Sequence, residues 1–322
     1  MPQAASAADT PTTPTSSGVM MDVFLTGAGG YIGGAVARRL IREGHTVRGL
    51  TRTPGVVDAL AAAGIAPVVG DLDDAALLKR EADRADAVIN AAHSDHRGAV
   101  DAFVDALRGS GKVLIHTSGT SVIGDDAQGQ YESEVVFDDA KPFSPGDHEI
   151  RRARYAIDRS VVDAGAAGVR SVVLCNSLIY GNGTGPRPQT VLIPPLVTQA
   201  QASKTVRVVG RGLNRWSTVH LDDMADLYHL ALTDPAATGL YFVEGGEDAS
   251  FADIGEAIAH RLGLGPVEPW DLDSAAAAWG EGFSRYALGA NSRVRATRAH
   301  DLGWRPSHPS ITNWIEQEMP LP

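Results

Sequence analysis

The sequence predicts an α/β protein built on a doubly wound parallel sheet, with a smaller lobe toward its C-terminal end. Strand-sized apolar runs alternate with amphipathic, helix-sized runs over most of the chain. The apolar runs are almost uninterrupted, as expected for strands that are covered on both faces. Near the start, one such run passes through a glycine-rich turn directly into a helical pattern, at residues 23–41.

The elements follow from this alternation. The expected strands are 23–26, 46–51, 66–69, 87–92, 112–117 and 169–175, and the expected helices are 35–41, 56–63, 73–83 and 99–107. Residues 219–232 and 239–243 read as a return to the main sheet, whereas a helix over 251–262 belongs to the smaller lobe. We therefore expect a dinucleotide-binding domain over 20–180 plus about 215–245, and a substrate lobe over about 181–214 plus 246–322.

Composition narrows the classes of function. The net charge of −11 argues against a nucleic-acid partner, which requires a basic surface. The longest apolar runs are the length of a strand, so no membrane span is expected. Residues 1–19 are rich in Ala, Pro, Thr and Ser and contain no Lys or Arg, which predicts a disordered leader rather than a secretory signal, and hence a cytoplasmic protein.

The glycine-rich turn has the pattern of a phosphate-binding segment. In the run Thr26-Gly27-Ala28-Gly29-Gly30-Tyr31-Ile32-Gly33, Gly27 permits the tight turn and Gly30 lets a phosphate approach the backbone. Gly33 lets the helix pack on the strand. The free N–H groups of the first helical turn then face an anion, so this segment predicts binding of a dinucleotide.

The residues at the end of the second strand indicate which dinucleotide is bound. An NAD site usually has a carboxylate there, but this strand ends in Thr51-Arg52-Thr53. Arg52 is placed to meet a 2′-phosphate, which favours NADP(H), with NAD(H) as the alternative. Asp71 is expected to face the adenine amino group or to cap the next helix, and Leu72 to pack on the ring.

By its motifs the chain resembles the short-chain dehydrogenase/reductase superfamily, in the extended branch of epimerases, dehydratases and ketone reductases. The matching pieces, in the order of the family, are the glycine turn, Gly70-Asp71-Leu72, Asn90-Ala91-Ala92, His116-Thr117-Ser118-Gly119-Thr120, Leu178-Ile179-Tyr180-Gly181, Val219-His220-Leu221-Asp222-Asp223 and Leu302-Gly303-Trp304-Arg305-Pro306. The resemblance implies a Rossmann sheet and a nicotinamide coenzyme. It also implies coenzyme contacts from Tyr31, Ile32, Ala91, Ala92, His93 and Thr117.

The resemblance further implies a hydroxyl that orients the substrate and a Tyr-x-x-x-Lys pair that moves the proton. The best match for the pair is Tyr155 with Arg159, in which arginine replaces lysine on the same helix face. A phenol has a pKa of about 10, so it needs such a cation to act near neutral pH. Ser118 or Thr120 is the candidate hydroxyl, and Tyr131 is a second candidate tyrosine.

The function expected from these residues is hydride transfer by an NADP(H)-dependent oxidoreductase that acts on a carbonyl or alcohol of a small organic molecule. Two alternatives remain, a nucleotide-sugar epimerase or dehydratase that retains NAD, and a non-catalytic sensor that binds NADP(H). The resemblance also suggests a homodimer. His93, Asp95 and His96 lack the further ligands of a recognisable metal site, so no metal is expected.

Overall fold

The computed structural model describes residues 19–308 and 310–321. The predicted leader, residues 1–19, therefore lies outside the described part except for Val19. Within that part no helix combines the length and the apolar character needed to cross a membrane.

A seven-stranded parallel sheet forms the centre of the molecule, which confirms the predicted fold class. Its strands are β1 (Asp22–Thr26), β2 (Thr46–Thr51), β3 (Ala66–Val69), β4 (Ala87–Asn90), β5 (Val113–Gly119), β7 (Arg170–Asn176) and β11 (Gly239–Val243). They lie in the order β3-β2-β1-β4-β5-β7-β11. The strand order thus reverses between β1 and β4, and this is where such sheets bind ligands, beyond the carboxyl ends of the strands.

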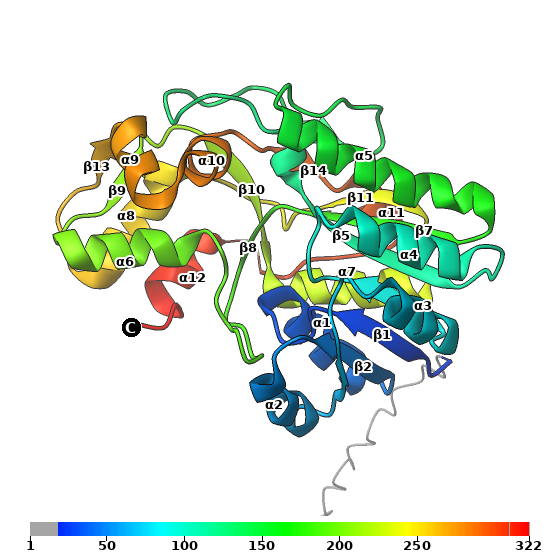
Figure 1. Cartoon of the computed structure of the whole chain (residues 1–322). Coiled ribbons are helices and arrows are strands. Elements are labelled where there is room, and N and C mark those ends of the chain that lie inside the picture. Colours follow the sequence, from blue (N-terminus) through cyan, green and yellow to red (C-terminus); the bar gives the residue numbers. More distant parts are fainter. Residues whose placement is uncertain (1–18, 309, 322) are drawn as a thin grey trace, which may run out of the picture.

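Helices cover both faces of this sheet (Figure 1). On one face lie α1 (Tyr31–Arg42), α2 (Val57–Ala62) and α7 (Leu221–Thr233), and on the other lie α3 (Ala75–Arg84), α4 (Arg97–Leu107) and α5 (Glu149–Asp163). Separate apolar clusters fill the two layers, one around Val36 and Leu227 and the other around Phe103 and Val161. Burial of apolar surface on both sides explains why the strands read as nearly uninterrupted apolar runs.

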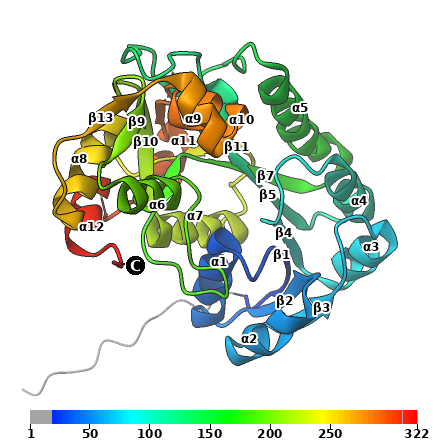
Figure 2. The ribbon, with the colours of Figure 1, turned by 60° about the vertical axis from the view of Figure 1, so that its left-hand side comes forward.

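The C-terminal part of the chain builds a smaller lobe with a core of its own (Figure 2). Its helical elements are α6 (Ile193–Ser203), α8 (Phe251–Leu262), α9 (Leu272–Trp279), α10 (Glu281–Phe283), the π-helical turn η4 (Ser284–Leu288) and α12 (Ile311–Gln317). Its strands are β8 (Leu178–Tyr180), β9 (Arg207–Val209), β10 (Arg215–His220), β12 (Asp248–Ser250) and β13 (Glu268–Trp270). Because α7 and β11 return from this lobe to the large sheet, the two parts are joined by several crossings of the chain.

The remaining elements are short and connect these layers. They are η1 (Pro54–Val56), η2 (Thr120–Ile123), β6 (Phe137–Asp138), η3 (Ala164–Ala167), β14 (Val294–Arg295) and α11 (Thr297–Asp301). The long segment between β5 and α5, singled out by its Gly, Asp and Ser content, contributes β6, which pairs in parallel with β14. This pairing ties the segment to the C-terminal part of the chain.

Candidate functional site

The glycine turn after β1 is shaped by close backbone contacts. Gly27 has a φ of +74°, and a Cβ atom there would lie 2.6 Å from the carbonyl oxygen of Ala91. A Cβ atom on Gly33 would lie 2.1 Å from the carbonyl oxygen of Gly27, whereas one on Gly30 would meet nothing closer than 3.2 Å. Packing therefore requires glycine at Gly27 and Gly33. At Gly30 the absence of a side chain lets a ligand approach the backbone closely.

Helix α1 opens directly from this turn and presents an anion site. Gly30 is its N-cap and offers no side-chain acceptor, and its first turn contains no acidic residue. The N–H groups of Tyr31, Ile32 and Gly33 accordingly have no carbonyl partner within the helix. Together with the positive end of the helix dipole, these N–H groups fit the pyrophosphate of a dinucleotide.

A cavity of about 280 Å³ extends from the glycine turn across the ends of β2, β3 and β4. Most of the residues predicted to hold the coenzyme line it, namely Gly27, Gly30, Arg52, Asp71, Leu72, Ala91, Ala92 and His93. Two predicted residues make other contacts: the Tyr31 hydroxyl donates to the carbonyl oxygen of Gly181 at 2.9 Å, and the buried Thr117 hydroxyl is 2.8 Å from the Tyr228 hydroxyl.

The polar groups of this cavity differ in how they are engaged. Within the described residues, the exposed Arg52 side chain has no ion-pair or hydrogen-bond partner. Asp71 accepts a hydrogen bond from the N–H of Asp73 at 3.0 Å, whereas the N-cap of α3 is Asp74. Asp71 therefore does not cap α3, and contact with the adenine is the role that remains predicted for it.

A buried hydrogen-bond chain fixes the end of β4. The Thr26 hydroxyl accepts from the N–H groups of Ala91 and Ala92, so it donates its own proton to Oδ1 of Asn90 at 2.7 Å. The Asn90 amide then donates to Nδ1 of His116 at 3.1 Å. This order places the proton of neutral His116 on Nε2, and burial keeps the ring neutral by lowering its pKa to about 4.

The predicted catalytic residues are not brought together. The Tyr155 hydroxyl donates to the carbonyl oxygen of Phe143 at 3.3 Å, and Arg159 pairs with Asp163 at 2.8 Å on the outside of α5. The buried Ser118 hydroxyl donates to Oδ2 of Asp158 at 2.8 Å. Thr120 is also fully buried, and its hydroxyl bonds that of Ser292. The second candidate tyrosine, Tyr131, is exposed.

The side of α5 that packs on the sheet carries Arg154 and Asp158 instead. Arg154 donates to Oγ of Ser121 at 2.8 Å and, through Nε, to Oδ1 of Asp95 at 2.7 Å. Asp95 lies in the loop after β4, beside the coenzyme cavity. The pair is mutually stabilised: hydrogen bonding to Asp95 raises the pKa of Arg154, and Arg154 lowers the pKa of Asp95.

Asp158 lies behind this pair and is almost fully buried. Desolvation raises its pKa to about 7, against the hydrogen bond from Ser118, which lowers it. Its Oδ1 faces Nε2 of His116 across 3.7 Å. The sequence signal for this face was present, because Arg154, Ile157, Asp158 and Val161 recur at the spacing of one helix stripe, and two of them are apolar.

A second cavity of about 300 Å³ opens on the other side of Arg154, between α5 and the small-lobe elements α10 and η4. Its walls are largely apolar and include Val122, Ile150, Phe283 and Ala287. Ser121 and Arg154 line it as well. His148, Arg151 and Tyr286 are further polar residues of the lining. A small molecule held here would therefore meet the Ser121 hydroxyl and the Arg154 guanidinium, these further polar side chains, and a predominantly apolar wall.

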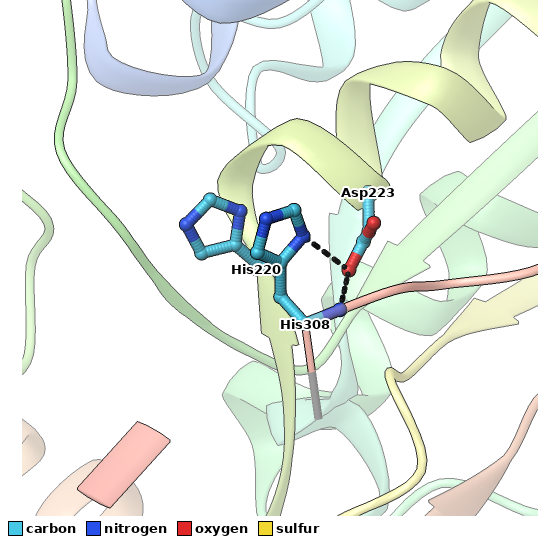
Figure 3. Close-up of side chains that lie close together, drawn as sticks. All are labelled: His220, Asp223 and His308. Atoms are coloured by element: carbon cyan, nitrogen blue, oxygen red, sulfur yellow. Dashed lines mark hydrogen bonds and ion pairs between the residues drawn. The ribbon is translucent and has the colours of Figure 1, made fainter. Parts of the chain in front are cut away.

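A second group of histidines, His220 and His308, lies beside Asp223 at the start of α7 (Figure 3). His220, Asp223 and His308 offer ligand atoms within 4.8 Å of one another. However, the rings of His220 and His308 stack with their centres 4.0 Å apart, and Nδ1 of His220 already accepts from the N–H of Asp222 at 3.2 Å. Asp223 already accepts from the N–H groups of Ser307 and His308. We interpret the cluster as an anchor for the C-terminal segment.

His93 and His96 are likewise engaged locally. His96 caps α4, since its Nδ1 accepts from the N–H of Ala99 at 3.0 Å, and its Nε2 lies 3.1 Å from Asp73. Nδ1 of His93 accepts from the N–H of Asp95. Both rings line the coenzyme cavity.

A parallel sheet with a glycine-turn cavity at its strand reversal defines a dinucleotide-binding protein of the Rossmann type. The model of the NAD dependent epimerase/dehydratase family matches residues 23–242. The chain belongs to this family. The predicted resemblance to the extended short-chain dehydrogenases/reductases is thereby confirmed.

The chain is also similar to individual proteins over most of their length. The chain is 30% identical over 333 residues to the oxidase ucsJ of Acremonium sp, covering 91% of this chain and 95% of that protein. It is 26% identical to a 2-alkyl-3-oxoalkanoate reductase of Stenotrophomonas maltophilia, covering 77% and 78%. Among solved structures, the UDP-glucose 4-epimerase of Thermus thermophilus in complex with NAD superposes with a TM-score of 0.73 at 19% identity, covering 92% and 97%.

Proposed function

We infer that the protein is an NADP(H)-dependent oxidoreductase that reduces a carbonyl, or oxidises the corresponding alcohol, of a small and largely apolar organic molecule. The observation that carries this inference is the Arg154–Asp95 ion pair. Asp95 belongs to the loop that borders the coenzyme cavity, and Arg154 lines the second cavity. A coenzyme and a substrate held in the two cavities would meet at this pair.

The preference for NADP(H) rests on Arg52. Its side chain lines the coenzyme cavity at the end of β2, where Thr51 and Thr53 flank it and no carboxylate is present. A guanidinium can bind a 2′-phosphate through two parallel hydrogen bonds. The carboxylate that would select NAD at this strand end is missing.

Ser121 and Arg154 are the groups best placed to act on a substrate carbonyl. The Ser121 oxygen accepts from Arg154, so its own O–H remains available to donate to a carbonyl oxygen in the second cavity. The hydroxyls of Ser118 and Thr120 are buried and already bonded. The guanidinium of Arg154 adds a fixed positive charge beside the oxygen on which negative charge develops.

A coenzyme held in the first cavity would supply the hydride for the carbonyl carbon. As that happens, Ser121 passes its proton to the carbonyl oxygen and regains one from water, with Arg154 stabilising the transient negative charge. The apolar wall formed by Ile150, Phe283 and Ala287 holds the remainder of the substrate by burial of apolar surface.

The test is titration of the purified protein with NADPH and NADH, followed by a panel of small ketones with the coenzyme that binds more tightly. Oxidation of NADPH that depends on a ketone is the expected result. Protein that retains NAD through turnover, with no net consumption of NADPH, would indicate the epimerase or dehydratase alternative. Tight binding of NADPH without turnover of any carbonyl would indicate a sensor.

A further inference from the structure

The segment between β8 and α6 forms a strap, residues 181–190, that leaves the small lobe and returns to it. Its base is held on both sides: the Tyr31 hydroxyl donates to the carbonyl oxygen of Gly181, and the Thr190 hydroxyl donates to that of Ile179 at 2.8 Å. The strap descends from α6 to the N-terminal end of α1, in the views of both Figure 1 and Figure 2.

The tip of the strap lies on the glycine turn. The N–H of Arg187 donates to the carbonyl oxygen of Gly29 at 3.1 Å. A Cβ atom on Gly185 would lie 3.3 Å from the carbonyl oxygen of Gly30, and one on Gly34 would lie 3.2 Å from Cα of Gly185. Backbone thus packs on backbone at this contact, while the cavity remains open along Gly27, Gly29 and Gly30.

Arg187 is the single charged residue of the strap, and it lines the coenzyme cavity. Between residues 19 and 321, apart from residue 309, its guanidinium has no ion-pair or hydrogen-bond partner. The chain has a net charge of −11, yet the Arg187 guanidinium lies near the anion-binding end of α1 without a carboxylate partner among the described residues. Its positive charge is therefore complementary to a phosphate ligand.

We propose that the strap is a phosphate clamp, in which Arg187 binds the pyrophosphate of the dinucleotide opposite the N–H groups of α1. This assignment rests on the proposed function, because it requires a dinucleotide in the first cavity. It adds that the small lobe helps to hold the coenzyme. Coenzyme binding would therefore stabilise the contact that the strap already makes with the glycine turn.

The experiment compares Arg187→Ala with the wild type in calorimetric titrations with NADPH, NADH and ADP-ribose, which share the pyrophosphate. Loss of one charge-assisted hydrogen bond corresponds to roughly 10-fold to 100-fold in Kd. We expect the same factor for all three ligands and a smaller loss for Arg187→Lys. We also expect hydrogen exchange in residues 181–190 to slow on ligand binding in the wild type and not in Arg187→Ala.

Arg42→Ala is the matched control, since Arg42 is an exposed arginine at the opposite end of α1. It should leave all three Kd values unchanged. A loss confined to NADPH would overturn the pyrophosphate assignment, because only the 2′-phosphate is special to that ligand. Unchanged affinities in Arg187→Ala, or equal losses in Arg42→Ala, would also overturn it. If the wild type binds none of the ligands, the proposed function itself fails.

Discussion

Arg154 joins helix α5 to the loop after β4 through Asp95, with its Nε 2.7 Å from Oδ1 of the carboxylate. The same guanidinium holds the Ser121 hydroxyl at the mouth of the second cavity. One side chain therefore borders the places proposed for coenzyme and substrate.

Ser121→Ala should lower kcat for ketone reduction by about 100-fold, the usual effect of removing one donor to a developing oxyanion. The Kd for NADPH should not change, because Ser121 does not line the coenzyme cavity. Tyr155→Phe should leave kcat within about twofold, since the Tyr155 hydroxyl donates to a backbone carbonyl. Steady-state kinetics of both variants show whether Ser121 or Tyr155 donates the proton. A large loss of kcat in Tyr155→Phe with little change in Ser121→Ala would support Tyr155.

Arg52→Ala should weaken binding of NADPH by about 10-fold or more and leave the Kd for NADH unchanged. The reason is that a hydrogen bond to a charged group contributes about 1.5–3 kcal/mol and only NADPH carries the 2′-phosphate. Fluorescence titration with the two coenzymes measures the ratio of the two Kd values. An equal loss for both coenzymes would place Arg52 elsewhere on the ligand.

Gly33→Ala should abolish coenzyme binding and lower the free energy of unfolding by about 1–3 kcal/mol, as overpacking of a tight contact does. The added methyl would lie 2.1 Å from the carbonyl oxygen of Gly27, which is backbone and cannot rotate away. Gly265→Ala is the control, because its Cβ would meet nothing within 4 Å. Urea unfolding and coenzyme titration of both variants provide the comparison, and equal behaviour would contradict the contact.

Asp158→Asn should become more stable relative to the wild type as the pH rises. Burial raises the pKa of Asp158 from 3.8 to about 7 in the folded protein. The folded state therefore keeps a proton that the unfolded chain releases at lower pH, and this contribution to stability, complete below about pH 4, is lost as the pH rises to about 7. Asparagine has no such proton.

The measurement for Asp158 is the Tm of variant and wild type at about pH 5 and about pH 8. The difference, variant minus wild type, should be larger at the higher pH. His116 is present in both proteins, so the pH dependence that its lowered pKa of about 4 adds to stability is common to both and cancels in the difference. A difference that does not vary with pH would mean that Asp158 is ionised in the fold.

Sequence patterns determined the sheet, the glycine turn and most of the cavity that follows it. These features depend on local rules: a strand, a turn that needs glycine and a helix start are contiguous in the chain, and their glycines reflect contacts such as that between Gly33 and Gly27. The loops after successive parallel strands then meet at one edge of the sheet. The positions of Arg52, Asp71 and Ala91 at the cavity could therefore be predicted from the sequence alone.

Only the tertiary structure decided which residues border the second cavity and the phosphate site. A shift of one residue along α5 rotates the side chain by about 100°, which is the difference between Tyr155 and Arg154. Sequence spacing constrains which residues share a helix face, but the packing of Ile157 and Val161 chooses the face that turns inward. Arg187 reaches the glycine turn from 158 residues further along the chain than Gly29, through contacts that no local pattern encodes.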